Sequence, residues 1–167
     1  VDYIPNNNFN GTDTLALSTS DGGSTGSGGV LTDSDSVSIT VTPVNDSPVN
    51  ALLTSYSTME DTALKLSGLS ISDADAASGN MSITLGVSRG TLSAGSTAGV
   101  TVAGSGTSSL TLTGTLREVN AYLAASNSVP VFTPAGDVTA AVTLTMSTND
   151  NGNTGGSAQT DTKTVTI

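Results

Sequence analysis

The feature of this sequence that most constrains its fold is an internal repeat. The segment "YIPNNNFNGTDTLALSTSDGGSTG", which starts at Tyr3, aligns with "FTPAGDVTAAVTLTMSTNDNGNTG", which starts at Phe132, an offset of 132 − 3 = 129 residues. After a one-residue gap, "TDSDSVSI" from Thr32 aligns with "TDTKTVTI" from Thr160. A period of this length is long for a solenoid and suits a tandem array of β-domains.

The phase of the repeat predicts the domain organisation. Residues 3–26 and 32–39 align with the end of the second copy, so we expect residues 1–44 to be the C-terminal strands of a preceding, incomplete repeat. Residues 45–48 are the predicted linker, and residues 49–167 a nearly complete repeat. Because a few strands with one apolar face seldom stand alone, we expect residues 1–44 to pack on a neighbouring repeat or to be completed by another chain.

The second copy has the alternation of apolar and polar residues that is typical of half-buried strands. Ile83, Leu85 and Val87 alternate with polar neighbours, and the many Gly, Ser and Thr residues favour tight turns over helices. An all-β antiparallel sandwich is therefore the expected fold class. The predicted strands cover residues 52–56, 63–72, 81–88, 100–103, 109–113, 129–133, 142–147 and 164–167.

One segment departs from this pattern and predicts a short helix. In "TLREVNAYLAA", Thr115 and Glu118 have the spacing of a capping box, and Leu116, Val119 and Leu123 share one helical face. Glu118 is thus interpreted as a helix cap and not as a catalytic group.

Charge and composition exclude several classes of function. The chain has 14 acidic residues and 4 basic ones, a net charge of −10, which argues against nucleic acid or an anionic membrane surface as a partner. With no Cys and no His, thiolate nucleophiles, the usual zinc sites and Ser-His-Asp triads are absent. No apolar run is long enough to predict membrane insertion.

Several motifs together resemble a known family. "FNGTDTL", "SDGG", "TDSDSVSITVTPVNDSPV" and "MEDTALKLSGLSISDADA" resemble the cadherin-like tandem repeats of large bacterial surface adhesins, the RTX-adhesin and VCBS-type repeat proteins, over essentially the whole chain. The resemblance implies an Ig/cadherin-like β-sandwich repeat, secreted or on the cell surface. It implies neighbouring repeats or identical subunits as partners, and cell-surface or glycan ligands that other domains would bind.

The resemblance also implies Ca²⁺ at the ends of such domains. The residues that match the family's calcium motifs are Asn45 and Asp46 in the linker, Asp73 and Asp75 in "DAD", Glu60 and Asp61 in "MED", and Asp150 and Asp21 in the turns before the last strands. Asp13, in "NNNFNGTD", is a further candidate, although the second copy has Val142 at that position. Asp21 precedes Gly22, so ordinary turn chemistry also explains it.

Loop topology predicts which of these residues lie together. Connections in an antiparallel sandwich alternate between its two ends, so Asp73, Asp75 and Asp150 should share the end at which Asn45 and Asp46 enter. The segment 60–61 should lie at the opposite end. Calcium takes roughly six to eight oxygen ligands, and acidic residues close to one another need a counter-charge. The sequence therefore predicts one calcium site and one half-site.

The function predicted from the sequence is a calcium-rigidified structural or adhesion repeat of a large extracellular surface protein. One alternative is a subunit of an extracellular filament or sheath assembled by β-strand complementation. Another is a glycan-binding adhesin module. Paired carboxylates can hydrolyse glycosides, but here the acids cluster at predicted domain ends and Trp is absent. We therefore expect no enzymatic activity.

Overall fold

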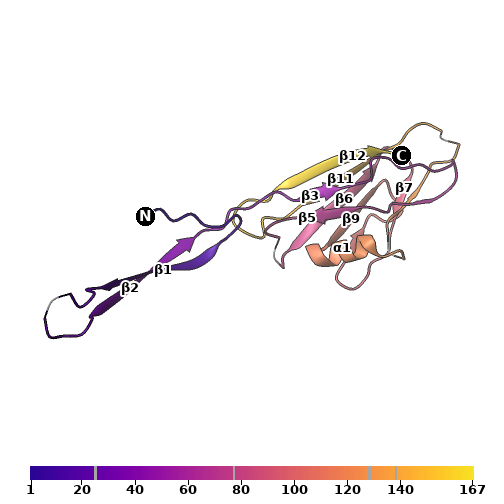
Figure 1. The fold of residues 1–167 in the computed structure, drawn as a ribbon. Coiled ribbons are helices and arrows are strands. Elements are labelled where there is room, and N and C mark those ends of the chain that lie inside the picture. The colour runs from indigo at the N-terminus through magenta and orange to yellow at the C-terminus, as the bar shows by residue number, and fades with distance from the viewer. Residues whose placement is uncertain (25, 77, 128, 138) are drawn as a thin grey trace. The chain divides into compact units, whose positions relative to one another are not determined.

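The chain folds into two compact units, Val1–Pro43 and Val44–Ile167, which we call unit 1 and unit 2. A computed structural model describes residues 1–24, 26–76, 78–127, 129–137 and 139–167 (Figure 1). Within these residues all strand pairs are antiparallel, which confirms the all-β prediction.

Unit 1 is a two-stranded hairpin. Strand β1 (Gly11–Ser20) pairs with β2 (Thr32–Val41) along its full length, with Leu15 opposite Val37. The alternation in both strands places Leu15, Leu17 and Val37 on one face, with Thr19 and Asp33 nearer the turn, and mostly Ser and Thr on the other face. None of the described apolar side chains of unit 1 is buried and most are exposed, so these side chains form no hydrophobic core.

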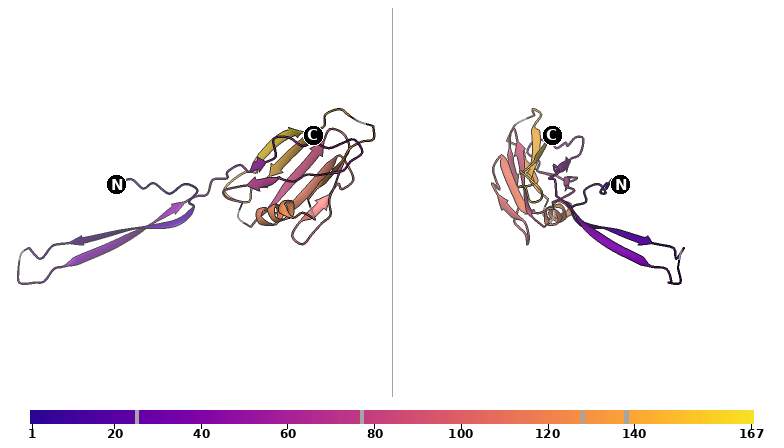
Figure 2. Two further views of the ribbon diagram at one scale, coloured as in Figure 1. Left: turned by 45° about the vertical axis from the view of Figure 1, so that its right-hand side comes forward. Right: turned by 90° about the vertical axis from the view of Figure 1, so that its left-hand side faces the viewer.

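Unit 2 is a sandwich built on a five-stranded sheet. The order of this sheet is β12 (Thr160–Thr166), β11 (Thr143–Asn149), β6 (Asn80–Val87), β9 (Ser109–Thr115) and β8 (Thr101–Ala103). The shorter strands lie in the second layer (Figure 2), where β4 (Leu64–Lys65), β10 (Val131–Thr133) and β7 (Thr91–Ser93) form one sheet and β3 (Val49–Ala51) and β5 (Ser70–Ser72) another.

The core of unit 2 lies between these layers. The inward-facing residues of the large sheet are fully or almost fully buried, namely Met81, Ile83, Leu85, Leu110, Leu112, Leu144 and Met146. They pack in one cluster with Leu66, Leu92, Phe132 and the helix residue Val119. Each such side chain stabilises the fold by about 1.5–3 kcal/mol relative to an exposed one.

The predicted helix is confirmed. Helix α1 (Leu116–Ala124) begins with a capping box, in which Thr115 accepts from the Glu118 N–H and the Glu118 carboxylate accepts from the Thr115 N–H. Asn120 ties the helix to β5, because its side chain exchanges two hydrogen bonds with the backbone of Ile71. No helix among the described residues is long and apolar enough to cross a membrane.

Two predicted strands of the second layer differ from the structure. The strand predicted over 52–56 is absent, and the chain pairs earlier, in β3. Tyr56 instead packs in the core and donates its N–H to the Thr166 carbonyl. The strand predicted over 63–72 is split into β4 and β5, because Gly68 between them has a φ of 77°, a left-handed conformation that does not continue a strand.

Strand lengths also differ from prediction. The short strand β7 was not predicted, since three residues carry too little alternation to be recognised. Strand β12 begins at Thr160 and not at residue 164, because its polar first half pairs with β11 at the edge of the sheet.

Candidate metal centre

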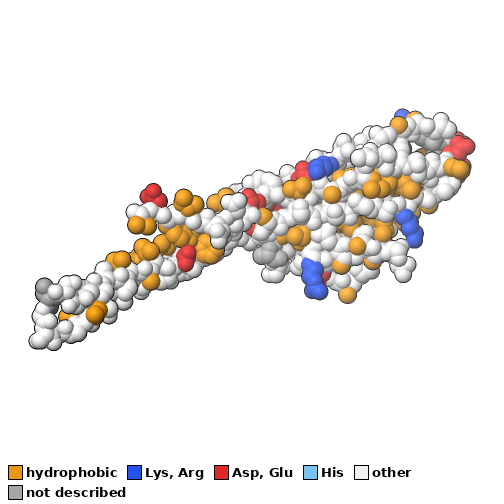
Figure 3. All heavy atoms as spheres, in the orientation of Figure 1, with side chains coloured by type: hydrophobic (Ala, Val, Ile, Leu, Met, Phe, Trp, Pro, Cys, Tyr) orange, Lys and Arg blue, Asp and Glu red, His pale blue; other side chains and the backbone are white. Residues whose placement is uncertain are grey.

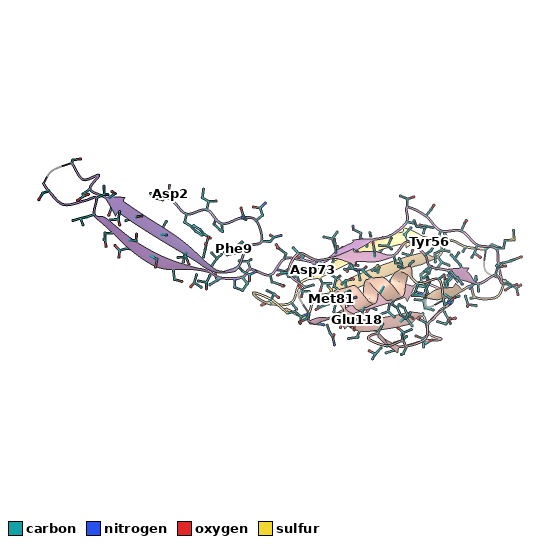
Figure 4. All side chains as sticks on the ribbon, turned by 60° about the horizontal axis from the view of Figure 1, so that its bottom comes forward. Asp2, Phe9, Tyr56, Asp73, Met81 and Glu118 are labelled. Carbon is teal, nitrogen blue, oxygen red and sulfur yellow. The ribbon has the colours of Figure 1, made fainter. Side chains whose placement is uncertain are left out.

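Five predicted site residues lie together at one end of unit 2. Asp73 and Asp75 directly follow β5, Asp150 directly follows β11, and Asn45 and Asp46 precede β3. Figure 4 labels Asp73 at this end of unit 2. This placement agrees with the loop topology that the sequence predicts. We call these five residues the aspartate cluster.

Asp150 is the buried anchor of the cluster, with a side chain that is 1 % exposed. Its Oδ1 accepts from the N–H of Gly152 at 2.8 Å and of Gln159 at 2.7 Å. Gly152 has a φ of 67° and close backbone neighbours, so the loop requires glycine there. Burial opposes ionisation, but these donors and the Asn45 amide outweigh it and hold the pKa of Asp150 below its ordinary value.

Asn45 ties the incoming segment to the loop between β11 and β12. Its Nδ2 donates to Asp150 Oδ2 at 2.7 Å and to the Ser157 carbonyl at 2.9 Å. The side chain is 9 % exposed, so both hydrogen bonds are shielded from water. Asn45 therefore acts on the cluster as a hydrogen-bond donor, and its amide oxygen is the only atom of its side chain that could bind a cation.

Asp73 and Asp75 have carboxylate oxygens that lack donors. The Asp75 N–H donates to Asp73 Oδ1 at 3.1 Å, and the Asp46 N–H donates to Asp75 Oδ2 at 3.1 Å. Their other oxygens, Asp73 Oδ2 and Asp75 Oδ1, are buried and have no hydrogen-bond partner among the residues that the structure describes. A buried carboxylate oxygen without a partner is costly, so this pair needs either a proton or a cation.

The pKa of Asp73 reflects this lack of partners. Burial, followed by the interaction with Asp75 and by the negative charges of Asp75 and Asp150, raises the pKa of Asp73 to about 6. A carboxyl group with this environment would release its proton readily when a cation binds, because the cation replaces the proton as counter-charge.

The donor set fits a hard cation, although the ligands do not form a complete cage. No three acidic side chains of the described residues are close enough together to form a ready-made metal site. Like-charged carboxylates repel one another when no cation lies between them, and the donors at this end are all oxygen atoms. Oxygen-only donors, with two carboxylate oxygens free, suit Ca²⁺ and not a thiophilic or imidazole-binding metal.

We expect Asp73 to make the calcium-free protein less stable as the pH rises. Its pKa is near 3.8 in the unfolded chain and about 6 in the folded one, so the folded state binds the proton more tightly. Stability from this group is therefore full below about pH 4 and is lost as the pH rises towards 6. Thermal melting in chelator, compared between the wild type and Asp73→Asn, measures this, and parallel melting curves across the range would contradict it.

Glu60 and Asp61 lie at the opposite end of unit 2, as the loop topology predicted. Glu60 lines a cavity of about 340 Å³ with Phe132, Val142 and Ile167, beside the start of β11 and the end of β12. Asp61 has a φ of 58° and its side chain is next to Gly136. Both acids are exposed, and they do not meet the aspartate cluster.

Asp21 and Asp13 belong to unit 1, where hydrogen bonds within the unit account for both. Asp21 Oδ1 accepts from the N–H of Gly23 at 2.9 Å and of Leu31 at 3.0 Å, and these bonds lower the pKa of Asp21. Asp13 accepts from the Tyr3 hydroxyl at 3.0 Å and from the Thr14 N–H at 2.7 Å. Turn and hairpin chemistry explains these two acids without a metal.

Asn50 is a structural residue next to the site that sequence analysis did not single out. It is fully buried in β3; its Nδ2 donates to the Met146 and Asp161 carbonyls, and its Oδ1 accepts from the Thr148 hydroxyl. Its N–H also donates to the Asp161 carboxylate at 2.8 Å. The motif "PVN" occurs twice, five residues apart, and ends in Asn45 and in Asn50. This repeated motif is the feature of the sequence that could have pointed to Asn50.

Comparison with protein-family models, with curated proteins and with solved structures finds no match for this chain.

Proposed function

We propose that unit 2 is a calcium-binding structural repeat of an extracellular surface protein. The observation that supports this most directly is a pair of buried oxygens, Asp73 Oδ2 and Asp75 Oδ1, to which no residue in the described part of the chain donates. The exposed side chain of Asp46 precedes β3 at the same end of the unit. A bound Ca²⁺ would supply the missing counter-charge, with backbone carbonyls and water completing its roughly six to eight ligands.

The proposed role of the ion is mechanical. Asp46 belongs to the first residues of unit 2, before β3, whereas Asp73 follows β5. An ion shared by the two would tie the incoming segment to the body of the sandwich and would restrict its motion. Extracellular calcium modules typically bind with Kd values of about 10⁻⁴–10⁻³ M, which an open site with few preformed ligands suits. We propose neighbouring repeats or identical subunits as the partners of such a module, and no enzymatic activity.

Calcium titration of the full chain tests this proposal. Isothermal calorimetry should detect saturable Ca²⁺ binding that Mg²⁺ does not reproduce, since Mg²⁺ requires a tighter octahedral shell. Small-angle scattering with Ca²⁺ should give a narrower distribution of interatomic distances than scattering in chelator. If millimolar Ca²⁺ produces neither heat nor a change in scattering, the proposal is wrong.

Substitutions at the two neighbouring linker residues should separate ion binding from structural hydrogen bonding. Asp46→Ala should weaken Ca²⁺ binding by roughly tenfold and leave the calcium-free melting temperature unchanged, because its side chain is exposed. Asn45→Ala should lower the melting temperature with or without calcium, because it removes two buried hydrogen bonds. Calorimetry and thermal melting measure the two effects, and identical behaviour of the variants would contradict this assignment.

The second candidate function is a filament subunit assembled by strand complementation. The exposed apolar face of the β1–β2 hairpin favours it, because such a face and a free strand edge are what an added strand or sheet would cover. Ordered polymers of the 167-residue chain in a solution mass measurement would favour this candidate, and a monomer would favour the structural repeat.

A further inference from the structure

The hairpin of unit 1 has the same internal structure as the β11–β12 hairpin of unit 2. Leu15 lies opposite Val37 in unit 1, and Leu144 lies opposite Val165 in unit 2. These are the residues that the sequence repeat aligns. We call the face of each hairpin that carries these residues its inner face. On the same face, Thr19 lies opposite Asp33 in unit 1, and Thr148 lies opposite Asp161 in unit 2. The two hairpins therefore share their register, and the aligned side chains of their strands lie on equivalent faces.

The connecting turns match as well. Asp21 receives hydrogen bonds from Gly23 and Leu31, as Asp150 does from Gly152 and Gln159. The backbone bond that closes each turn is also equivalent, at 3.1 Å in unit 1 and 3.2 Å in unit 2. On the outer faces, Ser34 bonds to Ser18 as Thr162 does to Ser147.

The two hairpins differ in what covers them. In unit 2, Leu144 and Met146 are 0 % exposed, and Val165 is 9 % exposed. The aligned residues of unit 1, Leu15, Leu17 and Val37, are 50 %, 60 % and 60 % exposed. Figure 3 shows hydrophobic side chains along the surface of this hairpin. In unit 2, β6 pairs with the edge of β11 that β12 leaves open, β3 contacts β11 through Asn50, and the core cluster of the second layer covers the apolar side chains.

The polar groups that hold β3 in unit 2 are also present in unit 1. Asn50 of β3 binds the Thr148 hydroxyl and the Asp161 carboxylate, for which unit 1 has Thr19 and Asp33. Neither Thr19 nor Asp33 has a side-chain partner among the described hydrogen bonds of unit 1.

A second polar contact of unit 2 has an equivalent group in unit 1. Asn45 of unit 2 binds Asp150 Oδ2, and the aligned oxygen is Asp21 Oδ2, to which no described residue donates. The inner face and the turn of the hairpin therefore each have polar groups, without a described partner, to which an asparagine side chain could form hydrogen bonds.

We propose that the inner face of the β1–β2 hairpin is the docking surface for a β-sandwich of the unit 2 type that lacks its own last two strands. This partner presents a β6-like strand to the free edge of β1. It also presents a β3-like segment with two asparagines five residues apart, like Asn45 and Asn50. One difference specifies the partner further. Lys163 donates to the Asn50 carbonyl in unit 2, and unit 1 has Asp35 at the aligned position, so the partner places a donor there.

A fusion protein tests the proposal with the full chain. The fusion consists of residues 44–131 followed directly by residues 3–167. Tyr3 aligns with Phe132, so residues 44–131 can form a sandwich with the β1–β2 hairpin. Hydrogen exchange is measured in chelator, which makes the result independent of calcium. The amides of β1 and β2 should be protected by at least about 100-fold relative to the unfused chain, because they become part of a cooperative core.

Two controls make the outcome decisive. In the first, residues 44–167 are followed by residues 40–167, so that the added sandwich has its own hairpin. If amide exchange is slow in both sandwiches of this control but stays fast in β1 and β2 of the fusion to Tyr3, the proposal is overturned. In the second, Asp33→Ala in the fusion should lower the protection of the β1 and β2 amides by at least about tenfold, whereas Ser34→Ala on the outer face should leave it unchanged. Protection of β1 and β2 in the unfused chain, with dimers or polymers in solution, would identify a second copy as the occupant and would also overturn the proposal.

Discussion

Calcium at one hundred times its Kd should raise the melting temperature of unit 2 by roughly 10 °C, which corresponds to about 2.7 kcal/mol of linked binding free energy. The double variant Asp73→Asn, Asp75→Asn should lose this rise. In chelator at neutral pH it should melt above the wild type, because the amides remove the repulsion and the burial of unpaired charge while they keep acceptors for the Asp75 and Asp46 N–H groups.

Differential scanning calorimetry at several calcium concentrations measures both effects. Asp13→Asn is the matched control, since Asp13 is an exposed acid of unit 1 whose hydrogen bonds stay within that unit. It should leave the calcium-dependent rise intact. An equal rise in the double variant and in the wild type would mean that the ion binds elsewhere.

Asn50→Ala should reduce the free energy of unfolding of unit 2 by about 3 kcal/mol. The variant removes one hydrogen-bond partner from each of three groups, the buried Thr148 hydroxyl and the carbonyls of Met146 and Asp161. Water cannot replace this partner at a site that is 0 % exposed. The N–H of residue 50 would still donate to the Asp161 carboxylate, so β3 should remain paired but weakly held.

Urea denaturation followed by circular dichroism measures this change. Ser47→Ala is the matched control, because Ser47 is exposed and its side chain makes one hydrogen bond, to Gln159. It should change stability by less than about 0.5 kcal/mol. A similarly small change in Asn50→Ala would show that the buried hydrogen bonds of Asn50 contribute little.

The central strands of unit 2 could be predicted from the sequence because each buries one face. Alternation in residues 81–88, 109–113 and 142–147 located β6, β9 and β11 to within two residues at each end. The second layer could not be predicted as well, because its strands are two or three residues long and its apolar residues, such as Tyr56, fill the core from loops. Periodicity carries no information over such short spans.

The composition of the aspartate cluster could be predicted, but its chemistry could not. The alternation of loops between two ends was sufficient to bring Asp73 and Asp150 together. The sequence did not indicate that both carboxylate oxygens of Asp150 accept hydrogen bonds whereas Asp73 Oδ2 has no donor among the described residues. That difference depends on backbone N–H groups of the turns, whose directions follow from the folded loops and not from residue types.

The segment from Asn50 to Tyr56 runs alongside β12 in the same direction. The Asn50 N–H bonds to Asp161, and six residues later the Tyr56 N–H bonds to Thr166, five residues along β12. A pulling force that acts through the start of this segment and the end of β12 would load these contacts in shear, all at the same time. Contacts that must break together resist force far better than contacts that unzip one by one, so we expect a force in this direction to meet more resistance than a force that peels the segment away from β12.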